Sequence, residues 1–218
     1  MDNNWILGKV LTFPAIIIAI SFHEFAHAFA AVKLGDDTPI HQGRYTLNPL
    51  KHIDPMGLIL LLFAGFGWGK PVQVNPLRFK NSSKGMAIVS LAGPVTNFIL
   101  AFITLIVTFL LETFGVWNLL DANLAGIMRD MIAYLAIYNI SLGIFNLIPL
   151  PPLDGSKILM HFLPYKARQI FQEKEQFFHI IFILLWISRL SVLIVQPIFN
   201  AVLYGMQLVI VSFFGLFM

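Results

Sequence analysis

Residues 21–27 read SFHEFAH, and they place His23, Glu24 and His27 inside a nearly continuous apolar run at residues 5–32. In a helix of 3.6 residues per turn, side chains four positions apart lie on one face, so both histidines can reach one metal ion with Glu24 beside it. On a polar helix such a set could arise by chance. Inside a hydrocarbon-length helix, ionisable groups are costly and normally mark a functional site. The segment therefore predicts a membrane-embedded zinc site with its own general base.

The composition is that of an integral membrane protein. Of the 218 residues, 58% are hydrophobic and 11% are charged, whereas soluble domains average roughly 45–50% apolar and about 25% charged residues. The chain contains no cysteine, so a transition-metal site must be built from His, Asp and Glu. The net charge of +3 is dispersed over loops and not gathered on one basic helix, so we expect no nucleic-acid partner.

Long apolar runs predict an all-α polytopic membrane protein with about five transmembrane helices. We expect these helices at residues 5–34, 84–111, 131–148, 177–195 and 197–218. Runs of this length cross roughly 30 Å of hydrocarbon, although Arg189 and Pro197 interrupt the last two. We expect residues 1–218 to form a single integral-membrane domain, with a motif-bearing core at about 5–163 and C-terminal helices at about 177–218.

The segment between the first two predicted helices differs from them in composition. Residues 40–83 carry Gly, Pro, Asn and charges in short alternating pieces, such as GRYTLNP at 43–49, which is typical of strand and turn. Residues 56–66 are apolar but too short to span a bilayer. We therefore expect a re-entrant, partly β loop, which is tolerated at membrane depth only against protein or water. An edge strand at residues 43–50 would be able to hold a substrate by backbone pairing.

A proline-rich break follows the third predicted helix. Residues 149–155 read PLPPLDG, and three prolines in four positions cannot continue a helix. We therefore expect Asp154 on an extended, rigid strip directly after the span. A catalytic zinc takes three protein ligands and keeps one position open, so Asp154 is the strongest candidate for the third ligand beside the two histidines.

The positions of lysine and arginine predict the topology. Seven of the fourteen lie between Lys33 and Lys84, and four more lie between Lys157 and Lys174. The positive-inside rule places both of these loops on the cytoplasmic side. We therefore expect a multi-pass protein of the cell membrane with its N-terminus outside. This arrangement brings His27 and Asp154 toward the same face.

Two motifs carry a resemblance to a known family. The His-Glu-Phe-Ala-His set at 23–27 together with NLIPLPPLDG at 146–155 resembles the site-2 protease family of intramembrane zinc metalloproteases, peptidase family M50. Gly-Pro at 93–94 followed by Asn97 is similar to a further motif of that family. The loop around residues 43–50 and the phrase WGKPV at 68–72 resemble its compact prokaryotic branch, which lacks PDZ and CBS domains.

This resemblance implies a role for each matching residue. His23, His27 and Asp154 would bind one Zn²⁺ per chain. Glu24 would be the general base that activates water and later protonates the leaving amine. Asn146 matches a family asparagine thought to orient the substrate or steady the oxyanion, and its alternative is a hydrogen bond to a neighbouring helix.

The implied activity is that of an intramembrane zinc endopeptidase. It would hydrolyse a peptide bond in or near a transmembrane segment of another membrane protein, as in regulated intramembrane proteolysis. Its partners would be that substrate and the lipid bilayer. We expect Asn97 to be a helix-packing polar group, and we expect His41 and His52 to be structural or solvated.

A membrane metal transporter or metal-binding sensor is the alternative function. Glu24 discriminates between the two, because a hydrolase needs a carboxylate that does not bind the metal, whereas a transporter typically carries acidic ligands on several helices. A catalytically dead scaffold is disfavoured because every motif residue is present. A zincin whose third ligand is a glutamate on a later helix is disfavoured because no suitable glutamate follows.

Overall fold

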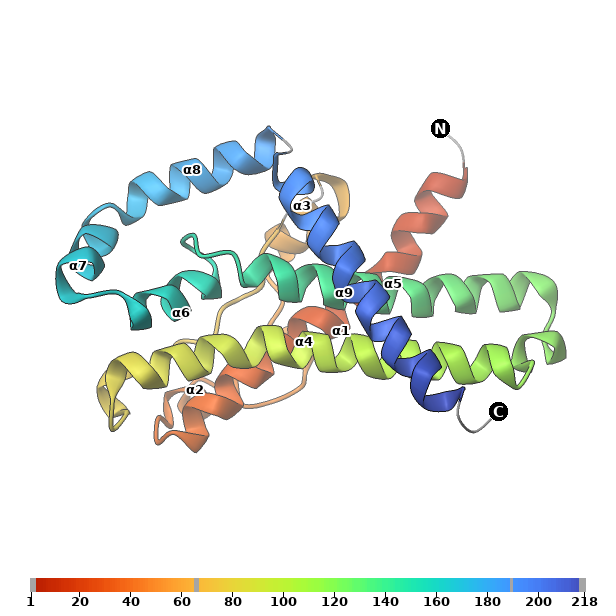
Figure 1. Ribbon diagram of the computed structural model, residues 1–218, viewed down its shortest axis with the longest axis horizontal. Helices are drawn as coiled ribbons and strands as arrows, with labels where there is room; N and C mark the ends of the chain where they lie inside the picture. Colours follow the sequence, from red (N-terminus) through yellow and green to blue (C-terminus); the bar gives the residue numbers. More distant parts are fainter. Residues whose placement is uncertain (1–2, 65–66, 189, 216–218) are drawn as a thin grey trace.

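The computed structural model describes residues 3–64, 67–188 and 190–215, and this part of the chain is almost wholly helical (Figure 1). Its α-helices are α1 (Asn3–Lys33), α2 (Thr38–His41), α3 (Pro55–Ala64), α4 (Ser82–Thr113), α5 (Ala122–Asn146), α6 (Asp154–Phe162), α7 (Tyr165–Glu173), α8 (Glu175–Ile187) and α9 (Leu190–Phe214). Short 3₁₀ turns η1 (Pro49–Lys51), η2 (Pro76–Arg78) and η3 (Val116–Leu119) lie between them. The predicted all-α class is confirmed for the described residues.

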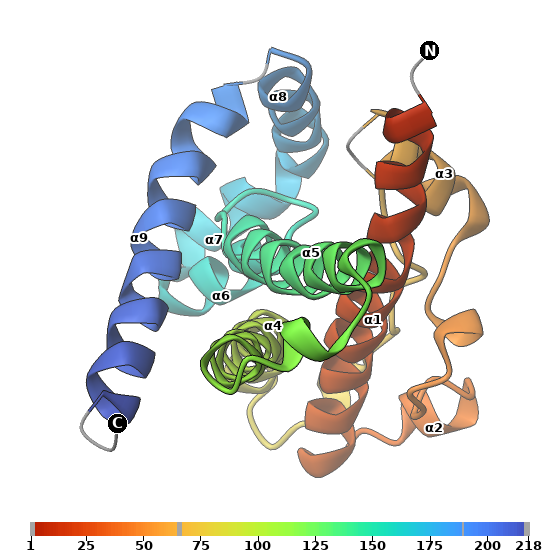
Figure 2. The ribbon, with the colours of Figure 1, turned by 90° about the vertical axis from the view of Figure 1, so that its right-hand side faces the viewer.

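Helices α1, α4 and α5 form the centre of the molecule. Figure 2 shows α4 and α5 side by side, with α1 packed against them from one side and α9 crossing them on the other. The turn between α4 and α5 uses Gly115 at a φ of 63°, a left-handed conformation that favours glycine. Asp121 then caps α5 by accepting hydrogen bonds from the backbone N–H groups of Asn123 and Leu124. This cap starts α5 at Ala122, nine residues before the predicted start at Met131.

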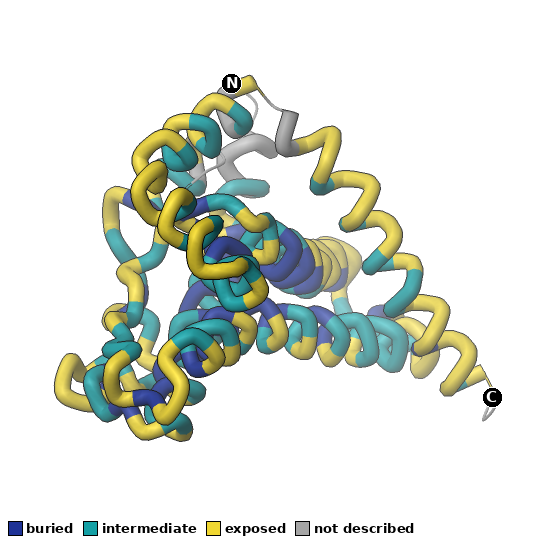
Figure 3. Tube along the Cα trace, turned by 60° about the vertical axis from the view of Figure 1, so that its left-hand side comes forward, coloured by how far each residue is buried: buried dark blue, intermediate teal, exposed yellow. Residues whose placement is uncertain are grey.

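The buried positions gather where α1, α4 and α5 meet (Figure 3). Small residues such as Ala15, Ala19 and Ala101 lie in these contacts and allow the helix backbones to approach closely. In contrast, most of α9 is exposed. Large apolar side chains on its outer face, among them Leu193 and Val209, are suited to contact with lipid.

Four described helices are long and apolar enough to cross a membrane: residues 8–33 of α1, all of α4, all of α5 and residues 192–214 of α9. The predicted span at 177–195 is not found, because α8 ends at Ile187 after 13 residues. The helix break falls near Ser188, and Pro197 lies inside α9 and does not begin it. Proline is tolerated inside membrane helices because neighbouring groups satisfy the freed carbonyl. Arg189 lies outside the described residues.

The predicted β character of the first loop is wrong, because its described residues contain no strand. One isolated antiparallel bridge joins Ile53 to Gly69. Residues 43–50 turn instead, with Gly43 at a φ of 64° and η1 beginning at Pro49. The prolines of this loop lack the N–H group that a β ladder requires. An added strand at 43–50 is therefore not supported.

Part of the same loop is helical. Asp54 caps α3 by accepting a hydrogen bond from the backbone N–H of Gly57, and Pro55 suits the first helical position. The re-entrant position of this segment stays a prediction, and residues 65–66 lie outside the described residues. Residues 70–75 run without helix or strand toward η2.

Asp36 fastens this loop to the end of α1. Its fully buried carboxylate accepts hydrogen bonds from the backbone N–H and hydroxyl of Thr38 and from the backbone N–H of Asn75 at 2.7 Å. Nearby, Phe79 packs with Ala31 and Val89 in a small apolar cluster. The loop is thereby tied to both α1 and α4.

We expect Asp36→Ala to lower the free energy of unfolding by about 1–3 kcal/mol, because it leaves buried backbone donors unpaired. Thermal unfolding in detergent micelles measures the effect. Asp37→Ala is the matched control, since Asp37 pairs with Arg78 and His41 at the surface, where ion pairs contribute little. Equal losses of stability in the two variants would contradict this role of Asp36.

Candidate metal centre

Two helices that are far apart in sequence bring three buried ligand groups together. His23 and His27 come from α1, and Asp154 is the first residue of α6. The Oδ2 atom of Asp154 lies 3.1 Å from Nε2 of His23 and 3.1 Å from Nε2 of His27. Within the described part of the chain, these three residues form the group of His, Asp or Glu side chains that could hold a metal ion. The structure thus brings together all three predicted ligands.

Asp154 does not lie on an extended strip as predicted. The proline-rich residues 149–153 form bends and turns instead, with the backbone N–H of Leu153 donating to the Leu150 oxygen, and Leu153 is the N-cap of α6. Asp154 therefore occupies the first turn, where a negative charge is favourable to the helix dipole. This rigid start of a helix, packed against α4, holds the carboxylate toward the histidines.

The group has the size that a tetrahedral zinc site requires. Zinc bonds to His nitrogen and carboxylate oxygen are about 2.0–2.2 Å long, which places ligand atoms about 3.4 Å apart. The observed separations of 3.1 Å from Asp154 to each histidine are close to this value. Two imidazoles and one carboxylate also leave one position open for substrate or solvent.

The Asp154 carboxyl is held in its ionised form. Burial alone would raise its pKa, but the imidazoles of His27 and His23, when protonated, outweigh burial through their positive charge and hydrogen bonds and lower the pKa below its usual range. Lys157, one turn further along α6, places its Nζ 3.5 Å from the other carboxylate oxygen. An ionised carboxylate is the form that binds a cation.

Each histidine is oriented from behind by an acceptor on α4. Nδ1 of His27 lies 2.8 Å from the backbone carbonyl oxygen of Val89, and Nδ1 of His23 lies 2.6 Å from Oδ1 of Asn97. Oxygen atoms of this kind accept, so both rings donate from Nδ1 and present a bare Nε2 to the metal position. Such contacts behind the ligands set the tautomer and tune metal affinity.

Gly93 allows α4 to lie against the two rings. A Cβ atom at this position would lie 2.6 Å from Cε1 of His23 and 2.6 Å from Cε1 of His27. Val89, Gly93 and Asn97 are four residues apart, so they share one face of α4. Asn97 was expected to be a packing residue, but the structure gives it a contact with a candidate ligand. The Gly93-to-Asn97 spacing is the sequence signal that could have indicated this role.

Glu24 lies next to the metal centre but is not one of the three grouped ligands. Its Oε2 accepts a hydrogen bond of 2.9 Å from the backbone N–H of Val72. Gly69 lies close by, because a Cβ there would be 2.9 Å from Cγ2 of Ile20 and 3.7 Å from Oε1 of Glu24. Residues 69–72 thus lie along α1 at the position of this carboxylate.

The other predicted residues have contacts elsewhere. Asn146, the last residue of α5, donates from Nδ2 to the backbone oxygen of Leu142 in its own helix, so its role at the site stays a prediction. His41 is exposed and pairs with Asp37. His52 is fully buried, and its ring lies 2.6 Å from the backbone oxygen of Thr46. These surroundings fit the solvated or structural roles expected for His41 and His52.

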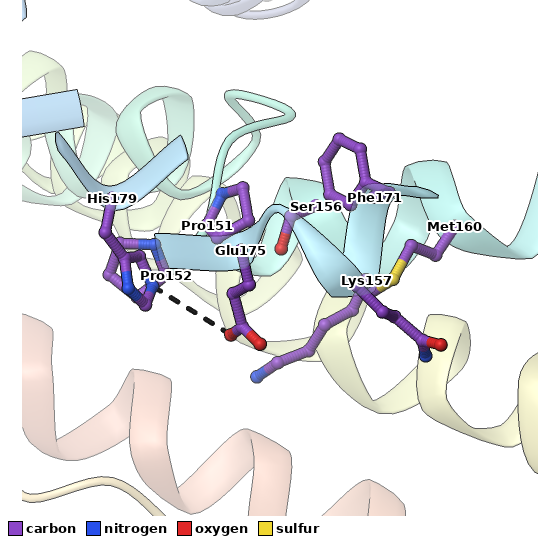
Figure 4. Close-up of a pocket in the computed structure, with 9 residues that line it drawn as sticks. Pro151, Pro152, Ser156, Lys157, Met160, Phe171, Glu175 and His179 are labelled. Atoms are coloured by element: carbon purple, nitrogen blue, oxygen red, sulfur yellow. Dashed lines mark ion pairs between the residues drawn. The ribbon is translucent and has the colours of Figure 1, made fainter. Parts of the chain in front are cut away.

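A cavity of about 240 Å³ lies beside the metal centre, between the proline-rich residues 149–153 and α6, α7 and α8 (Figure 4). Its lining includes Pro152, Lys157, Phe171 and Glu175. None of the three metal-site residues lines it. Lys157 lies between the cavity and the metal centre, because it lines the cavity and its Nζ is 3.5 Å from a carboxylate oxygen of Asp154.

Comparison with known sequences matches this architecture to one family. The family model described as Peptidase family M50 matches residues 11–189, a range that contains all three candidate ligands and Glu24. The chain belongs to peptidase family M50. The predicted family is confirmed, and with it the enzyme class, since the members are peptidases. The predicted membrane location is also supported, because several apolar helices surround the site.

Relatives from bacteria and an archaeon share most of this chain. YwhC of Bacillus subtilis is 41% identical over 186 residues, which cover 85% of this chain and 84% of YwhC. Rip2 of Mycolicibacterium smegmatis is 34% identical over 81% of this chain and 66% of its own length. The zinc metalloprotease MJ0392 of Methanocaldococcus jannaschii is 29% identical over 75% of this chain and 37% of its own length. No solved structure matches the chain.

We expect Gly93→Ala to reduce bound divalent metal to a small fraction of the wild-type content, because the added methyl group would displace both histidine rings. Elemental analysis of the purified protein measures the loss. Gly126→Ala is the matched control, since a Cβ at that helical position meets nothing within 4 Å. Full metal content in Gly93→Ala would show that the rings tolerate the methyl group.

Proposed function

We propose that this chain is an intramembrane zinc endopeptidase that cleaves a membrane protein in or near one of its transmembrane segments. The carrying observation is the convergence of the Nε2 atoms of two histidines on one buried carboxylate, with Glu24 beside them and outside the ligand group. Membership of peptidase family M50 and the name of MJ0392, a zinc metalloprotease, support zinc as the metal. We also propose that the described helices serve one metalloprotease domain, because α9 packs on both α4 and α5.

The residues divide the work of peptide hydrolysis. His23, His27 and Asp154 would hold Zn²⁺, which supplies a Lewis acid that polarises the scissile carbonyl and acidifies water. Glu24 takes a proton from the attacking water as the new C–O bond forms. When the C–N bond breaks, Glu24 returns this proton to the leaving amine nitrogen. The carboxylate therefore ends the cycle in the state in which it began.

A position inside the bilayer follows from the helix that carries the site. His23 and His27 lie within the part of α1 that is long and apolar enough to span a membrane. A substrate helix hides its carbonyl groups in hydrogen bonds, so it must unwind locally before one of them can reach this site. We propose that a transmembrane segment enters in such an unwound form, as in regulated intramembrane proteolysis, and that Asn146 helps to orient it.

The position of Glu24 favours hydrolysis over metal transport or sensing. A transporter would use the nearby carboxylate as a further ligand for the ion, whereas Glu24 lies outside the ligand group and is hydrogen-bonded to Val72. This arrangement leaves a carboxylate that can exchange protons next to the metal.

Glu24→Gln is expected to keep its zinc and to lose activity by about 10²–10⁴-fold, because the amide preserves the shape of the side chain but cannot take a proton. Cleavage of a co-expressed membrane substrate and zinc analysis of the purified protein provide the two measurements. His23→Ala is the contrasting variant and should lose the metal as well as activity. Activity of Glu24→Gln within a few-fold of wild type would remove Glu24 from the mechanism.

We further propose that both basic loops face the cytoplasm and that the N-terminus faces outside. Single cysteines introduced at Lys80 and Gln172 should then be protected from an impermeant thiol reagent applied to intact cells. A cysteine introduced at Asn123, in the exposed first turn of α5, should be labelled. The wild-type chain has no cysteine and therefore provides the blank. The reverse labelling pattern would mean the opposite topology.

A further inference from the structure

Two fully buried asparagines connect His23 to the backbone of α5. Asn97 lies 2.6 Å from the His23 ring through Oδ1, and its Nδ2 donates to Oδ1 of Asn139 at 2.8 Å. Nδ2 of Asn97 also donates to the backbone oxygen of Ala19 at 3.1 Å. Asn139 in turn donates from Nδ2 to the backbone oxygen of Leu135 at 2.8 Å. Both asparagines have an exposed fraction of 0%.

Backbone carbonyls, which can only accept, fix the direction of every hydrogen bond in this series from His23 to Leu135. The Leu135 oxygen requires the NH₂ group of Asn139, so the Asn139 oxygen must face Asn97. Asn97 then meets two acceptors on one side, the oxygens of Asn139 and Ala19, and uses both hydrogens of its NH₂ group there. Its own oxygen has to face His23. Rotating the Asn97 amide by half a turn would lose these bonds in a buried place, at a cost of about 1–3 kcal/mol for each unpaired group.

This fixed direction decides which nitrogen of His23 carries the proton. A neutral imidazole has one N–H group, and the Asn97 oxygen draws it to Nδ1, which leaves Nε2 bare and facing Asp154. If Asn97 turned its NH₂ group to the ring, Nδ1 would have to accept and Nε2 would carry the proton, so Nε2 could not bind a metal. His27 needs no such arrangement, because the carbonyl of Val89 cannot turn around.

We propose that Asn139 is a positioning residue of the metal centre: together with the carbonyl of Ala19 it fixes the orientation of Asn97 and thereby sets the metal-binding tautomer of His23. The inference rests on the proposed binding of zinc by His23. It concerns a residue of α5 that touches no ligand. Residues that contact a ligand directly are worth 10–100-fold in metal affinity, and the effect of Asn139 passes through one further side chain, so the loss expected on its removal is at the lower end of this range, about tenfold.

The test compares three variants by zinc affinity, measured by competition with a chromogenic chelator in detergent solution. Asn139→Ala removes the acceptor for Asn97 and should weaken zinc binding about tenfold. Asn139→Asp keeps an oxygen toward Asn97 and, when protonated, can still donate to Leu135, so its affinity should stay within about threefold of wild type. Thr104→Val is the matched control, because Thr104 is a buried residue of α4 that donates only to the Leu100 carbonyl of its own helix.

Thermal unfolding of the metal-free variants separates tautomer control from simple packing. A packing role would lower stability in Asn139→Ala and Thr104→Val alike and would leave zinc affinity unchanged in both. Wild-type zinc affinity in Asn139→Ala overturns the proposal, and so does a loss in Asn139→Asp as large as that in Asn139→Ala. If Asn139→Ala does not fold, a loss of zinc affinity in Asn139→Asp beyond about threefold still overturns the proposal. Failure of the wild-type protein to bind zinc would instead refute the proposed function.

Discussion

The close contact of α4 with α1 at Gly93 is the constraint on which the metal centre depends. The two histidine rings lie where the first carbon of any larger side chain would be. One helical turn before Gly93, the backbone oxygen of Val89 accepts a hydrogen bond from His27. One turn after Gly93, the side-chain oxygen of Asn97 accepts one from His23. A single face of one helix therefore leaves space for both rings and also orients them. Asp154 lies at the start of α6, which packs against α4, so the ligand group closes between α1, α4 and α6.

Polar groups this deep in an apolar bundle need partners, because each unpaired one costs free energy. The chain meets this need with hydrogen bonds between segments that are far apart in sequence. The side-chain amides of Asn97 and Asn139 form hydrogen bonds that join α1, α4 and α5. The buried carboxylate of Asp36 accepts hydrogen bonds from backbone N–H groups of the loop, which has no regular hydrogen bonding of its own. These connections also place residues 69–75 beside α1. The same hydrogen bonds that make the fold possible thus determine what surrounds Glu24.

Much of this site could be predicted from sequence because its signals are local. The four-residue spacing of His23 and His27 defines a helix face, and the proline-rich segment before Asp154 marks a helix end. The contact between His23 and Asp154, which are 131 positions apart, was predictable from the topology and from the family resemblance. The alternation of residue types at 43–50 predicts a strand, but it is short, and Gly43 and Pro49 turn the backbone instead. The early start of α5 depends on one cap at Asp121. The role of Asn139 could not be predicted, since it arises only when three helices meet.

The hydrogen bond between Val72 and Glu24 has a consequence for any incoming peptide. In the proposed mechanism, the nitrogen released from a cleaved bond would take its proton from the same carboxylate whose Oε2 already accepts a hydrogen bond from the backbone N–H of Val72. Two polypeptides, one internal and one foreign, therefore compete for one pair of oxygen atoms. The backbone of residue 72 would then set how closely the bond to be cleaved can approach Glu24.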